Sequence, residues 1–199
     1  NPYGNTKFAV EKILNDLNQS SKEWRIFSLR YFNPIGAHSS GCIGENPIEQ
    51  ANNIMPIIHN VAVGFREYLQ IYGNDWETND GTCIRDYIHV MDLAEGHVLS
   101  LEYLLKNNLK YTQLNLGTGK GTSVLELINS FQETNKVKVP YQFVDRREGD
   151  LPYSVADNSL AKELLNWNPK RNINEMCSDS WKWFKNNLRN MNMEDNKFN

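Results

Sequence analysis

The sequence begins with NPYGNTKFAVEKIL (residues 1–14), in which Tyr3 and Lys7 stand four positions apart. Apolar residues recur after Lys7 at the spacing of one helix face, so this stretch predicts an amphipathic helix over about residues 3–17. Side chains four residues apart lie on the same face of a helix. A lysine ammonium about 4–6 Å from a phenol favours the phenolate and lowers its pKa from about 10 by roughly 1–3 units. The pair therefore predicts an acid–base group for a hydroxyl proton, although the spacing alone also arises by chance.

The rest of the chain alternates between strand-like and helix-like segments. Residues 24–32, WRIFSLRYF, predict a buried strand, and a helix followed by such a strand indicates part of a parallel α/β sheet. Further strands are expected at residues 67–73, 84–89, 113–119 and 139–145. Further helices are expected at residues 54–64, 92–105, 123–131, 159–168 and 173–188. The fold class indicated is α/β.

Local signals predict where several of these segments begin and end. Asp92 is the expected N-cap of its helix, and Ser123 with Glu126 predicts a capping box. The segment GTGKGTS (residues 117–123) lacks the spacing of a phosphate-binding loop, so it predicts a tight turn into that capped helix. The polar residues 191–199 predict a frayed tail.

Composition limits the classes of protein that fit. The 199 residues carry a formal net charge of −3 without a basic block, so no nucleic-acid partner is expected. Cys42, Cys83 and Cys177 are widely spaced, and the four histidines show no ligand spacing. We therefore expect no disulfide, no metal site and a cytoplasmic location. No run of apolar residues is long enough to span a membrane, and the absence of an initial Met suggests part of a longer chain.

Six stretches in order carry a resemblance to a known family. They are the opening segment, LRYFNPIGAH (29–38), NNIMP (52–56), GTCIRDYIHVMDLAEGH (81–97), LNLGTGKGTSVLELI (114–128) and RREGDLPYSVAD (146–157). Together they resemble the UDP-glucose 4-epimerases of the extended short-chain dehydrogenase/reductase family, from residue 1 to about residue 188.

The resemblance implies the C-terminal part of an NAD(P)-binding Rossmann-type protein with a mixed α/β substrate-binding domain. Residues 1–33 would end the Rossmann domain, and residues 34–190 would bind a UDP-sugar, with residues 84–118 returning to the Rossmann sheet. In the family, a Gly-rich NAD loop and a catalytic Ser or Thr lie upstream of the Tyr/Lys helix. Neither is present in this sequence, and a homodimer is implied for the full-length protein.

The resemblance also implies a reaction and the residues that perform it. The tyrosine matching Tyr3 takes the proton from the sugar 4-hydroxyl while carbon 4 gives a hydride to NAD. The lysine matching Lys7 binds the nicotinamide ribose. Tyr31 and Phe32 join this pair as cofactor-binding residues. The 4-keto sugar then turns over in the pocket and takes the hydride back on its other face.

The UDP-sugar contacts are implied residue by residue. Arg85 and Arg147 match arginines that grip the diphosphate, where a planar guanidinium bonds two oxygens at once. Asp150 matches the aspartate that binds the uridine ribose. The other implied substrate residues are Asn33 beside the nicotinamide, Asn52, Asn53 and Ile54 at the diphosphate and nucleotide, Gln70, Ile71 and Tyr72 around uracil, and Ser154 near the sugar.

Two departures from the family pattern affect what is expected. The chain reads NPIEQANN at residues 46–53 where family members often read DPQGIPNN, which should alter the loop that closes on the nucleotide. Ser154 is small at a position that is bulky in some members, so N-acetylated UDP-sugars are also implied as substrates.

Two other readings stay open from the sequence. The chain could form a UDP-sugar-binding module without catalysis of its own, because the Gly-rich NAD loop is missing. It could also belong to a related sugar-nucleotide dehydratase or decarboxylase, which would share the Tyr/Lys pair.

Overall fold

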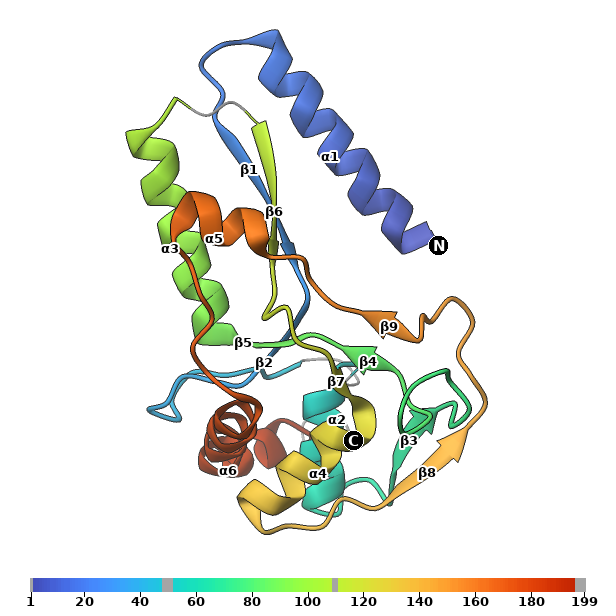
Figure 1. Ribbon diagram of the computed structural model, residues 1–199. Helices are drawn as coiled ribbons and strands as arrows, with labels where there is room; N and C mark the ends of the chain where they lie inside the picture. Colours follow the sequence, from blue (N-terminus) through green and yellow to red (C-terminus); the bar gives the residue numbers. More distant parts are fainter. Residues whose placement is uncertain (1, 48–51, 109–110, 196–199) are drawn as a thin grey trace.

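The computed structural model describes residues 2–47, 52–108 and 111–195, with side chains up to residue 188. Two lobes are stacked along the long axis of the molecule (Figure 1). We call the upper one the sheet lobe, made of α1, β1, β6, α3 and α5. The lower one is the pocket lobe, made of α2, β3, α4, β8 and α6.

The sheet lobe is built on two parallel strands, β1 (Ile26–Tyr31) and β6 (Tyr111–Leu116). Helix α1 (Pro2–Ser20) lies on one face of this pair, and α3 (Val90–Lys106) with α5 (Ser159–Leu165) covers the other (Figure 1). The core of the lobe contains Ile88, Leu93, Leu114, Leu116 and Trp167. The parallel α/β arrangement expected from the opening segment is confirmed.

Polar contacts hold α1 on the sheet. Glu11 forms a bidentate pair with Arg30 of β1, both bonds being 2.6 Å, and the hydrogen bonds from Arg30 hold the pKa of the Glu11 carboxyl below its usual range. The Gln113 side chain of β6 also donates to Glu11, at 2.9 Å. Within α1, only Asn18 is buried. The helix is therefore fixed mainly by hydrogen bonds rather than by apolar burial.

Helix α3 begins differently from the prediction. Its N-cap is His89, whose ring nitrogen Nδ1 accepts a hydrogen bond from the Met91 N–H at 3.0 Å. Asp92, the expected cap, lies inside the first turn and is fully buried. It is paired with the Arg171 guanidinium and accepts hydrogen bonds from the backbone N–H groups of Lys170 and Arg171. The Asp92 carboxylate therefore bonds the distant loop at residues 170–171 and does not cap its own helix.

Short strands join the two lobes. β2 (Asn33–Ile35) pairs in parallel with β5 (Tyr87–His89), while β4 (Ile84–Arg85) lies between β7 (Thr122–Ser123) and β9 (Tyr153–Ser154). The single strand predicted over residues 84–89 is therefore wrong, because it is divided at Asp86. The Asp86 carboxylate is buried and accepts hydrogen bonds from the backbone N–H groups of Thr118, Gly119 and Ala156 at 2.8, 2.9 and 3.2 Å.

The pocket lobe packs three helices against two strands. α2 (Ile54–Ala62), α4 (Val124–Asn135) and α6 (Ile173–Asp195) surround a buried core, and β3 (Leu69–Tyr72) pairs in parallel with β8 (Tyr141–Val144). The capping box of Ser123 and Glu126 is confirmed, with both bonds present. The turn predicted at residues 117–123 leads directly into that cap. Helix α6 runs beyond its expected end at Leu188 to Asp195, so part of the tail predicted to be frayed is helical.

The core of the pocket lobe includes one buried histidine. His59 lies among Phe131, Trp181 and Phe184, at ring-centroid distances of 5.7, 5.8 and 4.7 Å. Its Nε2 atom is 3.3 Å from the Ser180 hydroxyl oxygen. Burial among these rings lowers the pKa of His59 to about 3, because the charged imidazole loses its water. His59 is therefore neutral in the folded protein.

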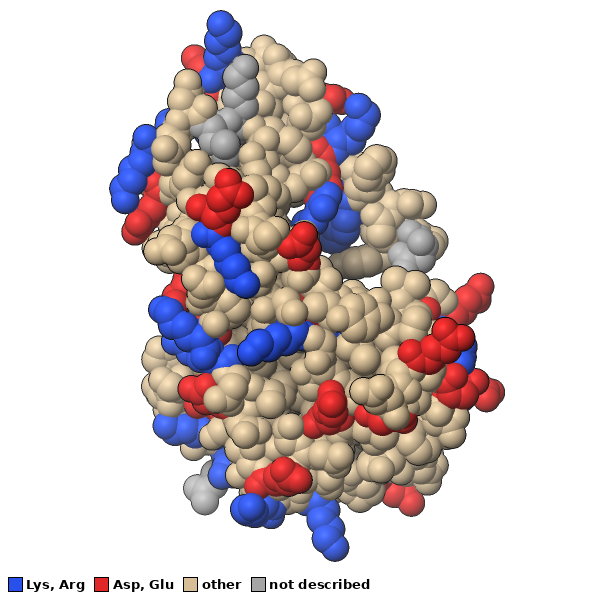
Figure 2. All heavy atoms as spheres, in the orientation of Figure 1, with Lys and Arg blue, Asp and Glu red and all other residues tan. Residues whose placement is uncertain are grey.

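The surface and the remaining polar groups add three observations. Figure 2 shows basic and acidic side chains mixed over the visible face. All three cysteines are free thiols. Within the described ranges, no helix is long and apolar enough to cross a lipid bilayer, and no group of three or more His, Cys, Asp or Glu side chains is placed to hold a metal ion.

Candidate functional site

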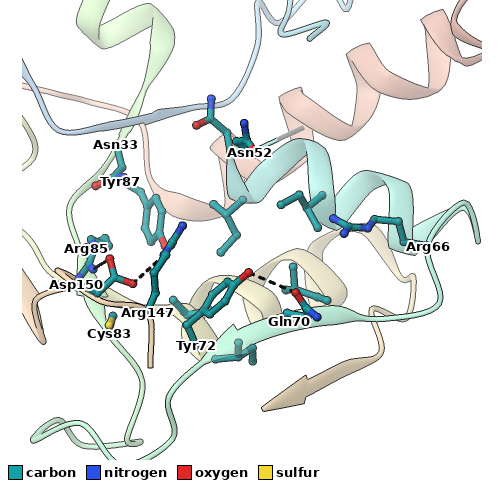
Figure 3. A pocket seen from close by; sticks show the side chains of 16 residues that line it. Asn33, Asn52, Arg66, Gln70, Tyr72, Cys83, Arg85, Tyr87, Arg147 and Asp150 are labelled. Atoms are coloured by element: carbon teal, nitrogen blue, oxygen red, sulfur yellow. Dashed lines mark hydrogen bonds and ion pairs between the residues drawn. The ribbon is translucent and has the colours of Figure 1, made fainter. Parts of the chain in front are cut away.

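A cavity of about 590 Å³ opens in the pocket lobe, beside the strands that join the two lobes (Figure 3). Its walls come from α2, β3, β4, the start of α4 and the loop before β9. The lining residues are Asn33, Asn52, Asn53, Ile54, Ile57, Arg66, Leu69, Gln70, Ile71, Tyr72, Cys83, Arg85, Tyr87, Val124, Arg147 and Asp150. Ten of the predicted substrate residues are among them, which leaves only Ser154 of that group outside the lining.

One end of the cavity holds two arginines bridged by a carboxylate. Arg85 Nη2 lies 3.5 Å from one oxygen of Asp150, and Arg147 Nε lies 3.3 Å from the other. Gly149, at φ +82°, turns the chain so that Asp150 folds back on Arg147. Two guanidinium groups against one carboxylate leave a net positive charge at this end. That charge suits a ligand with two adjacent anionic groups, such as a diphosphate.

The two arginines are held to different degrees. Arg85 is only 18% exposed, and its Nη1 atom donates to the carbonyl oxygens of Ile84 and Leu151 at 2.9 and 2.8 Å. Arg147 is 62% exposed, and its guanidinium lies over the Tyr72 ring, 4.7 Å from the centroid. Arg85 is therefore a fixed donor, whereas Arg147 reaches over the cavity from its rim.

The opposite wall is formed by α2 and β3. Asn53 is the N-cap of α2, and its side-chain amide donates to Glu45 at 2.6 Å. The Tyr72 hydroxyl donates to the Gln70 side chain at 3.3 Å, so these two side chains lie together along β3 (Figure 3). Asn52 also lines this wall. In the loop at residues 46–53, whose sequence departs from the family pattern, residues 48–51 lie outside the described residues.

The predicted acid–base pair lies on α1, outside the cavity lining. The Lys7 ammonium sits over the Tyr3 ring, 5.1 Å from its centroid, so the two side chains share one helix face as expected. The Tyr3 side chain is 71% exposed. The end of α1 that carries both residues is directed toward the pocket lobe (Figure 1).

The predicted cofactor residues follow β1 toward the cavity. The Tyr31 hydroxyl lies 2.8 Å from His97 Nε2 of α3. The Phe32 N–H donates to the Leu116 carbonyl at 3.3 Å, and the Asn33 N–H donates to the Asp86 carbonyl at 2.9 Å. Of these, only Asn33 reaches the cavity lining. The segment thus passes from the carboxyl end of a parallel strand, where dinucleotides bind in α/β sheets, into the pocket lobe.

Ser154 lies in β9, opposite Arg85 in the parallel register of β4 with β9. It does not line the cavity, although its neighbour across the sheet does. A contact between Ser154 and the sugar stays a prediction.

Several lining residues were missed from the sequence. Cys83 and Tyr87 flank Arg85 at two-residue spacing, which is the period of one strand face and could have identified them. Ile57 follows Ile54 by three residues on α2 and could have been found by helical spacing. Arg66, Leu69 and Val124 also line the cavity.

Comparison with known proteins places the chain in a family. The family model described as GDP-mannose 4,6 dehydratase matches residues 1–180. The chain belongs to this family. The match spans both lobes up to the middle of α6, so it includes the cavity and α1.

Curated members of the family resemble the chain closely over most of its length. The UDP-glucose 4-epimerase of Bacillus subtilis (strain 168) is 52% identical over 188 residues, which cover 94% of this chain and 55% of the relative. The human UDP-glucose 4-epimerase is 49% identical over 187 residues, covering 94% of this chain and 53% of the relative. The chain therefore spans about half the length of the curated relatives it matches, and the resemblance stated from the sequence is confirmed.

Solved structures agree with the family assignment. The UDP-glucose-4-epimerase of Stenotrophomonas maltophila, with bound NAD and formylated UDP-arabinopyranose, has a TM-score of 0.91 and 47% identity over 96% of this chain and 56% of that chain. The enzyme of Bifidobacterium longum, in complex with NAD+ and UDP, has a TM-score of 0.90 and 42% identity over 94% and 56%. These likenesses confirm the expected fold class, an extended short-chain dehydrogenase/reductase of Rossmann-like type.

Proposed function

We propose that the intact protein is an NAD-dependent UDP-glucose 4-epimerase that interconverts UDP-galactose and UDP-glucose in galactose metabolism. One observation carries the proposal: the cavity brings Arg85, Arg147, Asp150 and strand β3 together as the resemblance implies. The relatives at about 50% identity bear the same name. The family model carries the name of a dehydratase, but the relatives at about 50% identity are named for neither dehydration nor decarboxylation, so epimerisation is the activity favoured here.

The residues of the cavity hold the nucleotide part of the substrate and leave the sugar free. Arg85 and Arg147 bind the diphosphate, Asp150 accepts hydrogen bonds from the ribose hydroxyls, and the backbone of β3 meets the base. Asn52, Asn53 and Ile54 cover the nucleotide from α2. Because these groups hold the nucleotide firmly, the sugar needs few fixed contacts and is free to turn over.

The acid–base chemistry belongs to Tyr3 and Lys7. The Lys7 ammonium lies over the Tyr3 ring, 5.1 Å from its centroid, so the two side chains stand on one face of α1. The Tyr3 oxygen takes the proton from the sugar 4-hydroxyl and later returns it to the same oxygen. A proton that is taken and returned by one group leaves no net change in the protein.

The residues present fit an NAD cofactor. Tyr31 and Phe32 stand at the carboxyl end of β1, which is the edge of a parallel sheet where a dinucleotide binds. Lys7 would donate to the nicotinamide ribose of a bound NAD, and Tyr3 would lie beside that ribose. The chemistry that NAD supplies when bound is the reversible acceptance of a hydride from carbon 4 of the sugar.

Three further parts of the proposal concern partner, place and substrate range. Exposed apolar side chains of α1, among them Phe8 at 69% and Ile13 at 65%, support a homodimer through this helix. The three free thiols support a cytoplasmic location. The small Ser154 supports acceptance of N-acetylated UDP-sugars, which is refuted if the intact protein does not convert UDP-GlcNAc while Ser154→Tyr still converts UDP-galactose.

The test is conversion of UDP-galactose by the purified intact protein with NAD, followed by the anomeric proton signals in NMR. The proposal predicts an equilibrium mixture with UDP-glucose and no net reduction of NAD. Tight binding of UDP without any interconversion would instead identify the non-catalytic UDP-sugar-binding module. Release of water or carbon dioxide from the sugar would identify a dehydratase or decarboxylase.

A further inference from the structure

Arg66 lines the cavity at the end opposite the two bridged arginines. It belongs to the connection between α2 and β3, just after Gly64, whose φ of +83° ends the helix. Its backbone N–H donates to the Asn60 carbonyl at 3.2 Å, and the Phe65 N–H donates to the same oxygen at 2.8 Å. The connection is therefore fastened to the end of α2. Figure 3 shows the Arg66 guanidinium directed inward from the connection after α2, while Arg85, Arg147 and Asp150 lie together at the other end.

The Arg66 guanidinium differs from those of the other arginines. Each other arginine whose side chain is described donates to a named acceptor: Arg25 to Leu104, Arg30 to Glu11, Arg85 to Ile84 and Leu151, Arg147 to Asp150, Arg146 to Asp75, and Arg171 to Asp92. Within the described part of the chain, no carboxylate or carbonyl takes that place for Arg66. The side chain is nevertheless half-buried and lines the cavity. A donor-only group in this position is suited to an acceptor that arrives with the ligand.

The cavity also has apolar walls, which suit a flat ring rather than a phosphate. Ile54 and Ile57 of α2 and Leu69 of β3 also line the cavity, and they supply apolar walls. Gln70 lies next along β3. A nucleoside diphosphate has one anionic end and one flat heterocyclic end. The bridged pair Arg85 and Arg147 suits the anionic end. The base therefore lies at the end where Arg66 points inward.

The geometry of a pyrimidine then selects one atom. The ring joins the ribose through N1, and position 4 lies directly across the ring from N1. When the ribose is held near Asp150, position 4 is the part of the base that reaches farthest from the diphosphate. In uracil this position carries a carbonyl oxygen, which accepts hydrogen bonds. In cytosine it carries an amino group, which can only donate and cannot pair with a guanidinium.

We infer that Arg66 is a base-specificity residue that donates to the O4 carbonyl of uracil and rejects the 4-amino group of cytosine. This inference rests on the proposed function, because it assumes that the cavity binds a nucleoside diphosphate. It adds a side-chain contact to the base, and with it a reason for the preference for uracil.

The test compares UDP and CDP binding to the intact protein by isothermal titration calorimetry. The wild type should prefer UDP, and Arg66→Met should weaken UDP binding by about tenfold or more, as expected when a charge-assisted hydrogen bond is lost. CDP affinity should stay within about twofold, so the preference should collapse. Arg25→Met is the matched control, because Arg25 is an exposed arginine bonded to a carbonyl far from the cavity, and it should leave both affinities unchanged.

The outcomes separate the inference from the function beneath it. If Arg66→Met keeps the wild-type preference for UDP, the contact with O4 does not exist. If Arg66→Met weakens UDP and CDP equally, the guanidinium serves the phosphates and the inference is overturned. If the wild type binds neither UDP nor CDP, the proposed function fails first.

Discussion

Helix α1 of the sheet lobe and the core of the pocket lobe are stabilised in different ways. In the sheet lobe, α1 buries only Asn18 and leaves Phe8 69% exposed. In the pocket lobe, Phe131 is completely buried and packs edge-on against Trp181. The cavity that would grip the nucleotide is thus set in the tightly packed lobe, whereas Tyr3 and Lys7 stand on an exposed helix. Under the proposed function, binding and chemistry would be carried by separate parts of the chain, so single substitutions should separate them.

The largest expected effect is on activity alone. Tyr3→Phe removes the proposed proton acceptor and should lower kcat by about 10²–10⁴-fold, the usual contribution of a general acid–base group. The UDP dissociation constant should not change, because Tyr3 does not line the cavity. Steady-state kinetics and calorimetry on the intact protein measure the two quantities. Tyr141→Phe, on the exposed strand β8, is the matched control, and equal loss in both variants would refute the role of Tyr3.

The next effect tests the packing difference directly. Phe131→Ala should lower the free energy of unfolding by about 3–5 kcal/mol, because it opens a cavity among buried rings. Phe8→Ala should change it by no more than about 0.5 kcal/mol, because that side chain is mostly exposed. Denaturation by urea measures both. Similar losses of unfolding free energy in the two variants would show that α1 and the pocket-lobe core do not differ in this way.

A smaller effect is expected on binding alone. Arg85→Met should weaken UDP binding by about 10–100-fold, because it removes the charge-assisted hydrogen bonds proposed for the diphosphate and the ion pair of Arg85 with Asp150. Arg146→Met is the control, since Arg146 pairs with Asp75 and does not line the cavity. Unchanged UDP affinity in Arg85→Met would remove the diphosphate from this end of the cavity.

The smallest effect is a pH dependence that belongs to the pocket lobe. The pKa of His59 is about 3 in the folded protein and about 6.5 in the unfolded chain. As pH falls below about 6.5, the His59 imidazole therefore binds a proton in the unfolded chain but not in the folded protein. Its contribution to stability is present at neutral pH and should fall by about 2 kcal/mol between pH 7 and pH 5. Unfolding free energies at several pH values measure this loss.

The variant His59→Gln should lose less stability over the same pH range, whatever its stability at pH 7. Some slope should remain, because burial also lowers the pKa of His89. An identical slope in the variant would show that His59 is not the group responsible.

Much of the fold could be predicted because its signals are local. The capping box of Ser123 and Glu126 can be recognised within four consecutive residues. The helix after Tyr3 can be recognised from apolar residues that recur at each helical turn. The expected domain boundaries stay a prediction, although the parallel pairing of β1 with β6 supports a return of residues 84–118 to the first sheet.

The errors arose where distant residues compete for a side chain. Asp92 looked like a cap, but Arg171 and its neighbouring backbone take the carboxylate inside the first turn. The break at Asp86 depends on backbone N–H groups at positions 118, 119 and 156, which no local pattern reveals. Arg66 was missed because its place in the cavity depends on how the chain leaves α2.

We expect one pocket to hold the nucleotide while Tyr3 faces the sugar, and a crystal structure of the intact protein with NAD and UDP-glucose would test this claim most directly. The diphosphate should lie within hydrogen-bond distance of the Arg85 and Arg147 guanidinium groups. The Tyr3 hydroxyl should lie about 2.6–3.2 Å from the sugar O4 atom. A nucleotide bound outside the cavity, or a sugar whose O4 atom points away from α1, would contradict the claim.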